Sequence, residues 1–255
     1  MTRWIRFVHR DRLGFGTLEG DRIAIYEGEL FADPAPTGRS LARAEVTLAT
    51  PCDPSKMICL WNNFHAAAAK FNWQEPAEPL YFLKAASAFQ PGDVRIPRPK
   101  NYSGRVLFEG ELGVVIGKRC KAVTEAEAPN YVFGFTCVND VTAFDLLNND
   151  PSFQQWTRAK SFDGFGVIGP VIATGLDPHG LAVRTVLDGQ ERQNYPVADM
   201  FFEPYRLVSL ISQDLTLLPG DIISCGTSVG SGSMKPGGKI DISIEGIGTL
   251  SSVME

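Results

Sequence analysis

The sequence contains no long hydrophobic run, and this absence argues against a membrane-spanning helix. No apolar stretch approaches the ~20 residues that such a helix needs. The first residues, MTRWIRFVHRDR, carry charges throughout and lack the apolar core of a signal peptide. Lysine and arginine form no cluster, and 24 basic against 29 acidic residues give a net charge of −5. Without a basic patch, neither nucleic acid nor a membrane is an expected partner, and we expect a soluble, cytoplasmic protein.

Cysteine pairs and histidine clusters are also missing. The five cysteines are odd in number, form no CxxC motif and stand mostly in apolar runs. This pattern is typical of buried thiols in a reducing compartment, and it does not suit a disulfide framework. The three histidines are too far apart in sequence for a zinc site with local ligand spacing.

One glycine-rich loop partly matches two catalytic motifs, but the surrounding sequence does not fit either of them. GTSVG, residues 226–230, matches the GxSxG pattern of a nucleophilic serine, but the SGSMKPGG that follows cannot form the helix that this turn requires. All three histidines precede this serine, which is the wrong order for the triad. The same loop lacks the GK[ST] ending of a phosphate-binding loop. A serine hydrolase is therefore not expected, and this loop is not a Walker A motif.

The residues that are present favour β-structure. Residues 1 to about 30 alternate apolar and polar side chains between turn signals, which indicates antiparallel strands. ADPAPTG and TPCDPSK then interrupt the pattern, so we predict a small N-terminal accessory domain over residues 1–50 and a main domain over 51–255. The main domain holds many segments rich in β-branched residues, with no regular strand and helix alternation. The sequence predicts a mainly β protein with short helices, of the α+β class.

Short helices are predicted at four places. A helical segment after an asparagine cap, a Thr124–Glu127 capping box and two further helix-forming stretches carry the signals. The four stretches are NNFHAAAAKF, TEAEAPN, VTAFDLLNND and PYRLVSLISQD.

Two glutamates, Glu109 and Glu111, stand two residues apart in the apolar segment FEGELGVVIGK. On a strand they point to the same face, and leaving both ionised and unpaired in a core would cost several kcal/mol each. The ordinary alternative is an exposed edge strand. Asp140, at the end of FGFTCVND, adds a third carboxylate, unless it only caps the following helix. Three hard oxygen donors from two strands suit Mg²⁺ or Mn²⁺.

Two lysines and a glycine-rich turn supply further candidates. Lys160 in RAKSFDGF and Lys84 in PLYFLKAAS stand among small and apolar residues. Each is either a surface lysine with a buried stem or a cation that neutralises charge on a metal-bound substrate. In the CGTS turn, Thr227 offers a hydroxyl and Gly226 an amide that could bind an oxyanion. The alternative is an ordinary glycine-rich loop without a binding role.

These stretches resemble the fumarylacetoacetate hydrolase family over roughly residues 55–252. The resemblance implies a mixed β-sandwich roll with a small N-terminal β-domain, assembled as a homodimer. It also implies Mg²⁺ or Mn²⁺ on Glu109, Glu111 and Asp140, and substrate contacts from Lys160 and Thr227. The stretches that carry it are EPLYFLKAAS, EGELGVVIGKRCKAV, YVFGFTCVNDVTAFD, AKSFDGFGVIGP and LLPGDIISCGTSVGSGSMKPGGKIDISIEGIGTL.

The chain departs from the family at the expected base. Where hydrolytic members carry a histidine and a glutamate in G-R-N-Y-x-x-H-x-x-E, this chain has Ala67 and Lys70. His65 stands two positions early, about 200° around a helix, and could serve as a catalytic base only if the segment shifts register. In the later motif D-x-[ST]-A-R-D-x-Q, Phe144 and Leu147 replace the polar arginine and glutamine. Phe144 is therefore an apolar candidate for substrate binding.

The resemblance implies an enzyme that acts on a small 2-oxo or 1,3-dicarbonyl acid through a metal-stabilised enolate, in aromatic catabolism. Hydrolysis of a carbon–carbon bond, of the acylpyruvate or fumarylpyruvate type, is the family default. The missing base leaves open a decarboxylase of oxaloacetate type, an isomerase of carboxymethyl-hydroxymuconate type, or a non-catalytic metal-binding relative. We expect Glu109→Ala or Asp140→Ala to abolish metal binding and leave folding intact.

Overall fold

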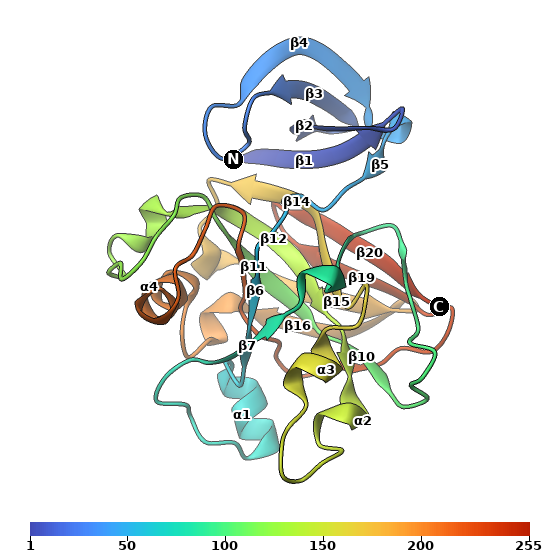
Figure 1. Ribbon diagram of the computed structural model, residues 1–255, viewed down its shortest axis with the longest axis vertical. Coiled ribbons are helices and arrows are strands. Elements are labelled where there is room, and N and C mark those ends of the chain that lie inside the picture. Colours follow the sequence, from blue (N-terminus) through green and yellow to red (C-terminus); the bar gives the residue numbers. More distant parts are fainter.

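The computed structural model describes residues 1–255, and it is mainly β with short helices, as predicted. Most strands belong to one large mixed sheet, against which a smaller sheet packs (Figure 1). No helix has both the length and the apolar composition needed to cross a membrane. The molecule is thus a layered β-structure of the kind that the resemblance implies.

The first fifty residues form an antiparallel meander at one end of the large sheet (Figure 1, blue). β1 pairs with β2 along its length and, through Thr2 to Trp4, with β14 of the main body. The ADPAPTG segment is expected from its sequence to be irregular, but its second half forms the start of β4. Because β4 is an edge strand, it tolerates a proline, which has no amide hydrogen to donate to a neighbouring strand. The strands are β1 (Thr2–His9), β2 (Arg12–Glu19), β3 (Arg22–Glu27), β4 (Ala35–Ala42) and β5 (Thr47–Leu48).

The rest of the large sheet runs from β14 through β12, β11, β17 and β6 to β7, with β8 on β14. All seven residues of β11 are buried, as befits a strand covered on both faces. The strands are β6 (Met57–Trp61), β7 (Leu80–Lys84), β8 (Phe89–Pro91), β11 (Gly110–Ile116), β12 (Val132–Asp140), β14 (Gly166–Thr174) and β17 (Ile222–Ser224).

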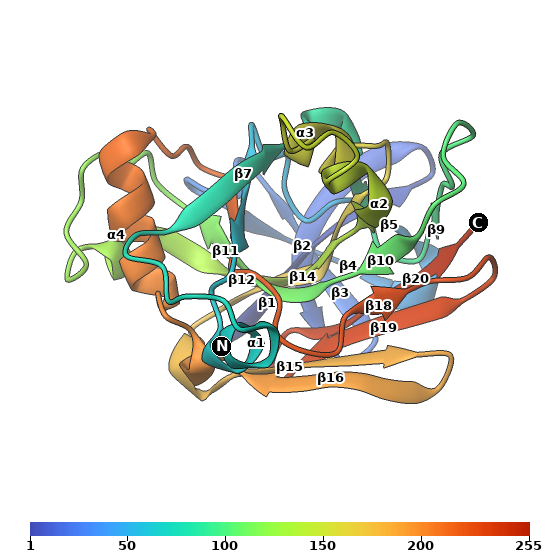
Figure 2. The same ribbon diagram turned by 90° about the horizontal axis from the view of Figure 1, so that it is seen from below.

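Two smaller sheets complete the sandwich. A five-stranded sheet in the order β16, β15, β19, β20 and β9 forms a second layer, and β13, β10 and β18 form a short third sheet (Figure 2). The strands are β9 (Arg95–Ile96), β10 (Val106–Phe108), β13 (Thr142–Ala143), β15 (Ala182–Leu187), β16 (Gln190–Pro196), β18 (Gly232–Ser233), β19 (Lys239–Ile244) and β20 (Gly248–Met254).

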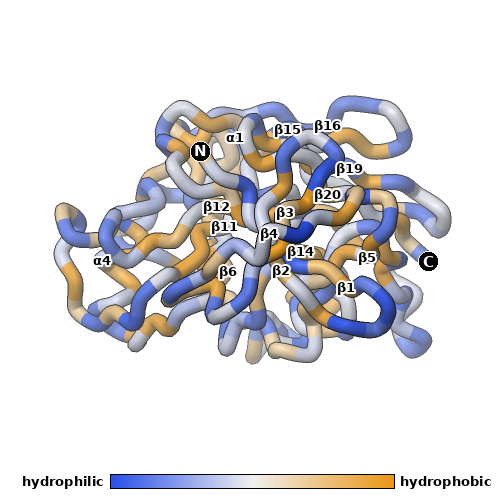
Figure 3. Tube along the Cα trace, turned by 90° about the horizontal axis from the view of Figure 1, so that it is seen from above, coloured by the Kyte–Doolittle hydropathy of each residue, from blue (hydrophilic) through white to orange (hydrophobic).

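The hydrophobic core follows the alternation of strand faces. Leu112 and Val114 of β11 join the large cluster between the sheets, whereas Val115 joins a smaller cluster on the other face. The central strands are accordingly mostly apolar and the peripheral loops polar (Figure 3). All five cysteines are free and buried, as their apolar settings indicate.

The four α-helices are short, and α4 coincides with the predicted stretch PYRLVSLISQD. The predicted asparagine cap of α1 is wrong: the cap is Phe64, because the Asn63 amide instead bonds the Phe202 and Cys225 carbonyls. The helices are α1 (His65–Phe71), α2 (Phe144–Leu147), α3 (Trp156–Lys160) and α4 (Pro204–Asp214), with 3₁₀ turns at η1 (Arg43–Glu45), η2 (Ala86–Ala88), η3 (Ala128–Asn130), η4 (Pro178–Gly180) and η5 (Val197–Asp199).

The capping box at Thr124 and Glu127 forms as predicted. The Glu127 carboxylate accepts hydrogen bonds from the Thr124 amide at 2.9 Å and from its hydroxyl at 2.7 Å. Only the 3₁₀ turn η3 follows it, so the local signal is real but the helix is a single turn.

Candidate functional site

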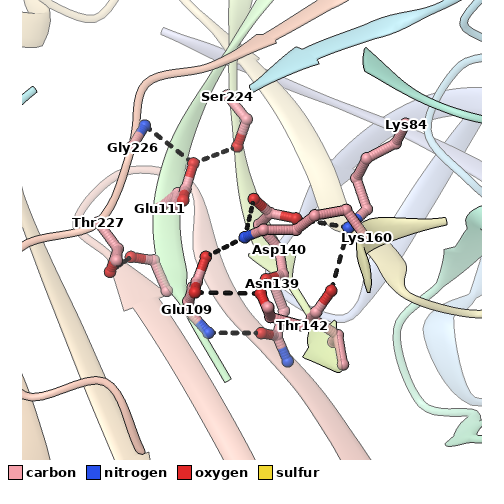
Figure 4. Close-up of polar contacts among 12 residues, drawn as sticks. Lys84, Glu109, Glu111, Asn139, Asp140, Thr142, Lys160, Ser224, Gly226 and Thr227 are labelled. Carbon is pink, nitrogen blue, oxygen red and sulfur yellow. Dashed lines mark hydrogen bonds and ion pairs between the residues drawn. The ribbon is translucent and has the colours of Figure 1, made fainter. Parts of the chain in front are cut away.

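The register of β11 and β12 brings three carboxylates to one face of the large sheet. Glu111 is paired with Val138, and the Asp140 amide donates to the Glu109 carbonyl at 3.0 Å, so Glu109 and Asp140 are neighbours across the strands. Residues two apart on a strand share a face. One oxygen from each of Glu109, Glu111 and Asp140 lies within 4.8 Å of the others (Figure 4). Because β11 lies between β12 and β17, an exposed edge strand is excluded.

Two buried lysines reach this group from β7 and α3. The Lys84 ammonium donates to Asp140 Oδ1 at 2.5 Å and to the Val141 carbonyl at 3.1 Å. The Lys160 ammonium donates to Glu109 Oε2 at 2.5 Å and to Asp140 Oδ2 at 2.8 Å. The side chains of Lys84 and Lys160 are 0% and 4% exposed, so neither is a surface lysine. Asp140 ends β12 and binds both lysines, so it does not act as a helix cap.

The charges of this cluster do not balance. Three carboxylates face two lysines, and Glu111 forms no ion pair. Its carboxylate accepts hydrogen bonds only from the Ser224 hydroxyl at 2.5 Å and the Gly226 amide at 2.9 Å. Burial, followed by repulsion from Asp140 and Glu109, raises the pKa of Glu111 well above its usual value. The cluster therefore lacks positive charge at Glu111.

The other ionisable groups respond to their partners. Burial opposes the charged form of Asp140, but Lys160 and Lys84 outweigh it and lower the pKa of that carboxyl. Burial raises the pKa of Glu109 despite the nearby Lys160. For Lys160, burial is outweighed by the charges of Asp140 and Glu109, which raise its pKa. The two carboxylates thus favour the cationic form of Lys160.

The residues present fit a divalent cation. The three carboxylates, of which Glu111 and Asp140 are buried, offer the hard oxygen donors that Mg²⁺ and Mn²⁺ prefer, and a bound cation would give Glu111 the positive partner that it lacks. Both Asp140 oxygens already accept from lysines, but each carboxylate oxygen has two lone pairs and can accept a second contact. Glu109, Glu111 and Asp140 are therefore the residues that would hold the metal.

A second network holds Gly110, the residue between the two glutamates. The Thr227 hydroxyl donates to the Gly110 carbonyl at 3.0 Å, and the Tyr195 hydroxyl donates to the same oxygen. The Gln193 side chain accepts from the Gly110 amide at 3.1 Å and donates to Thr227 Oγ at 2.8 Å. Thr227 thus contacts the backbone of the site. Its hydroxyl donates one of these bonds and accepts the other, which leaves one lone pair free.

Several of these residues carry no signal in the sequence. Gln193 and Tyr195 lie in QERQNYP, a polar strand that the sequence does not mark as a strand, and they reach the site only because β16 belongs to the second sheet. Ser224 and Thr142 stand beside recognised motifs and could have been found there; the Thr142 hydroxyl donates to Glu109 Oε1 at 3.0 Å.

Gly110→Ala is expected to destabilise the protein by about 1–3 kcal/mol and to weaken metal binding, because the added Cβ would meet Thr185 Oγ at 2.2 Å and Gln193 Oε1 at 3.1 Å. Chemical denaturation and Mn²⁺ titration measure the two effects. The matched control is Gly180→Ala, where a Cβ meets nothing within 4 Å. Parental stability and affinity in Gly110→Ala would contradict the proposed role of this network.

The structure does not bring every predicted residue to the carboxylates. His65 is exposed at the start of α1, with its ring 4.1 Å from that of Phe201, and no hydrogen bond joins it to the site. Phe144 is 38% exposed and carries the Arg105 guanidinium over its ring at 4.6 Å. Gly226 contributes its amide to Glu111. In this arrangement no histidine is placed to activate water.

Comparison with family models covers nearly the whole chain. Residues 56–255 match the model described as fumarylacetoacetate (FAA) hydrolase C-terminal, and residues 2–51 match the one described as Rv2993c-like, N-terminal. The 4-hydroxyphenylacetate degradation bifunctional isomerase/decarboxylase of Salmonella dublin is 36% identical over 236 residues, which cover 91% of this chain and 54% of that protein.

Solved structures are similar over both parts of the chain. A 2-hydroxyhepta-2,4-diene-1,7-dioate isomerase from Mycobacterium marinum has a TM-score of 0.91 and 37% identity, covering 100% of this chain and 98% of that one. A maleylpyruvate hydrolase from Sphingobium sp. SYK-6, in complex with manganese(II) and pyruvate, has a TM-score of 0.81 and 26% identity, covering 99% and 98%. Similar folds thus occur in proteins named for two different reactions.

Proposed function

Since the chain belongs to the fumarylacetoacetate hydrolase family, we propose that it is a divalent-metal-dependent enzyme acting on a small 2-oxo or 1,3-dicarbonyl acid. The observation that carries this proposal is the buried cluster of three carboxylates and two lysines, in which Glu111 lacks a cation. The complex of maleylpyruvate hydrolase with manganese(II) and pyruvate supports the same class of ligand.

Each residue of the cluster has a role in this proposal. Glu109, Glu111 and Asp140 hold Mg²⁺ or Mn²⁺, which when bound supplies Lewis-acid stabilisation of an enolate oxygen. Lys160, whose cationic form Asp140 and Glu109 favour, stabilises negative charge on the substrate by hydrogen bonding. Lys84 holds Asp140 in place and neutralises part of its charge. Thr227 positions the strand between the glutamates and presents its hydroxyl beside it.

We propose carbon–carbon bond hydrolysis of the acylpyruvate or fumarylpyruvate type as the reaction. A decarboxylase or isomerase is the second candidate, because the cluster holds no histidine and the exposed His65 forms no hydrogen bond with it. The name of the Salmonella dublin relative supports this alternative and a place in aromatic catabolism. We also propose a homodimer, from the resemblance, and a cytoplasmic location, from the composition.

Turnover of a small panel of acids tests the proposal. With Mn²⁺ or Mg²⁺ we expect the protein to consume at least one of acetylpyruvate, fumarylpyruvate, oxaloacetate and a carboxymethyl-hydroxymuconate, and to lose that activity with a chelator. Product analysis separates hydrolysis from decarboxylation and isomerisation. Failure to convert any of them, with the metal bound and the protein folded, would support a non-catalytic metal-binding relative instead.

A further inference from the structure

Four aromatic side chains form a row that leads away from the carboxylate cluster. We define the aromatic row as Phe82, Trp156, Trp61 and Trp73. The ring centroids of Phe82 and Trp156 are 5.0 Å apart, those of Trp156 and Trp61 are 6.2 Å apart, and those of Trp61 and Trp73 are 4.9 Å apart. At its inner end, the Lys160 ammonium lies 5.0 Å from the centre of the Phe82 ring. The row is therefore continuous with the candidate metal site.

The same two elements carry the lysines and the inner rings. Phe82 and Lys84 are two apart on β7, so they share a strand face. Trp156 and Lys160 are four apart on α3, so they share a helix face. Trp61 ends β6 and Trp73 follows α1, and α1, β7 and α3 lie in the lower part of Figure 1. The two lysines and the two inner rings of the row thus lie on the same faces of β7 and α3.

The fold itself does not account for the three tryptophans of the row. Trp61, Trp73 and Trp156 pack against neither hydrophobic cluster, and Trp73 is 38% exposed. The chain has only four tryptophans, so three of them stand outside the core at one place. Large aromatic surfaces left partly open beside a cluster of polar groups are typical of a ligand site.

The charges beside the row favour an apolar occupant. Lys84 and Lys160 are both engaged by carboxylates of the cluster. Arg158 is two residues from Trp156 and from Lys160, about 200° around α3, so it points away from the row. At the inner end of the row no free cation is therefore placed to hold a second carboxylate. At the outer end, the Lys70 ammonium lies 5.6 Å from the centre of the Phe71 ring, which stacks on Trp73 at 4.8 Å.

From this geometry we infer that the aromatic row is a binding subsite for an aryl or alkyl tail of a 2-oxo acid whose oxo-acid head lies at the carboxylate cluster. The inference rests on the proposed function and extends it to a substrate class. Within the proposed function it favours monocarboxylic 2-oxo acids with an apolar tail over short dicarboxylic acids, because a short tail that ends in a carboxylate would be desolvated against the inner rings, where no free cation is placed.

Binding of 2-oxo acids to the full-length, Mn²⁺-loaded protein tests the inference. Calorimetry measures the affinities of pyruvate, 2-oxohexanoate, phenylpyruvate, 2-oxo-4-phenylbutanoate and 2-oxoglutarate. These compounds share the 2-oxo acid group and differ only in the group attached to it. We expect the phenyl compounds to bind at least about tenfold more tightly than pyruvate, and 2-oxoglutarate no more tightly than pyruvate. Tryptophan fluorescence should change with the phenyl compounds, which gives a readout independent of turnover.

Two variants and a matched control locate the effect. Trp156→Ala should remove the advantage of the phenyl compounds and leave oxalate affinity unchanged. Trp73→Ala, at an exposed position, should reduce the advantage of 2-oxo-4-phenylbutanoate by at least about threefold without affecting the fold. Phe153→Ala is the control, because Phe153 is 69% exposed, precedes α3 and stacks on no other ring.

The outcomes separate the two proposals. Equal affinity for all tails, or an advantage that persists in Trp156→Ala, overturns the subsite while oxalate binding upholds the proposed function. If Trp156→Ala changes the oligomeric state in solution but still binds the phenyl compounds more tightly than pyruvate, the row is a contact between copies of the chain and not a subsite. Failure of oxalate to bind the Mn²⁺-loaded protein would overturn the proposed function, and the subsite with it.

Discussion

Glu111→Gln is expected to lower Mn²⁺ affinity by at least about 100-fold and to make the metal-free protein more stable than the parent at neutral pH. Loss of a group that merely supports a metal ligand already costs 10–100-fold, so loss of a ligand should cost more. Glutamine keeps an oxygen that can accept from the Ser224 hydroxyl and the Gly226 amide. Its neutrality removes the repulsion from Glu109 and Asp140.

The direction of the stability effect follows from the pKa shift. The folded state raises the pKa of Glu111, so the ionised carboxylate opposes folding above its unfolded pKa, and that penalty disappears as the pH falls below it. A neutral residue has no such penalty at neutral pH. Calorimetric titration with Mn²⁺ and thermal unfolding in the presence of a chelator measure the two effects. The control is Glu125→Gln, at an exposed position, and unchanged Mn²⁺ affinity in Glu111→Gln would exclude Glu111 as a ligand.

Asp140→Ala is expected to abolish Mn²⁺ binding and also to destabilise the metal-free protein by about 3–5 kcal/mol. Asp140 is the partner of both Lys84 and Lys160, whose side chains are almost completely buried. Removing it leaves Lys84 charged without an anionic partner and Lys160 with Glu109 alone. The expectation from sequence that folding stays intact is therefore revised for this residue.

Urea denaturation of the metal-free protein measures this loss. The folded state lowers the pKa of Asp140, so its stabilising contribution is present above the unfolded pKa and is lost as the pH falls through the folded value. The loss in Asp140→Ala should accordingly be largest near neutral pH. Combining it with Lys84→Met should recover part of the stability, because an apolar pair can replace a buried ion pair. A loss below about 1 kcal/mol would show that the ion pairs do not support the fold.

The sequence predicted those elements whose local patterns agree with their tertiary setting. The apolar run GVIGPVIAT is β14, and PYRLVSLISQD is α4 from its first residue to its last. The sequence did not predict strands whose position in the sheet, rather than their local pattern, determines their structure. β4 contains prolines but lies at an edge, and β16 is polar because only alternate side chains are buried.

The sequence by itself determined the chemistry that is available in this protein: three carboxylates, two lysines and a threonine in stretches that resemble one family. It also determined the mainly β character, because strand propensity and turn residues act locally. Only the tertiary structure decided how these groups combine. The register of β11 and β12 places Glu109 beside Asp140. The packing of β7 and α3 buries Lys84 and Lys160 next to that aspartate, and segments far apart in the chain bring the rings of the aromatic row together. These outcomes depend on contacts between residues far apart in the chain, which local patterns do not encode.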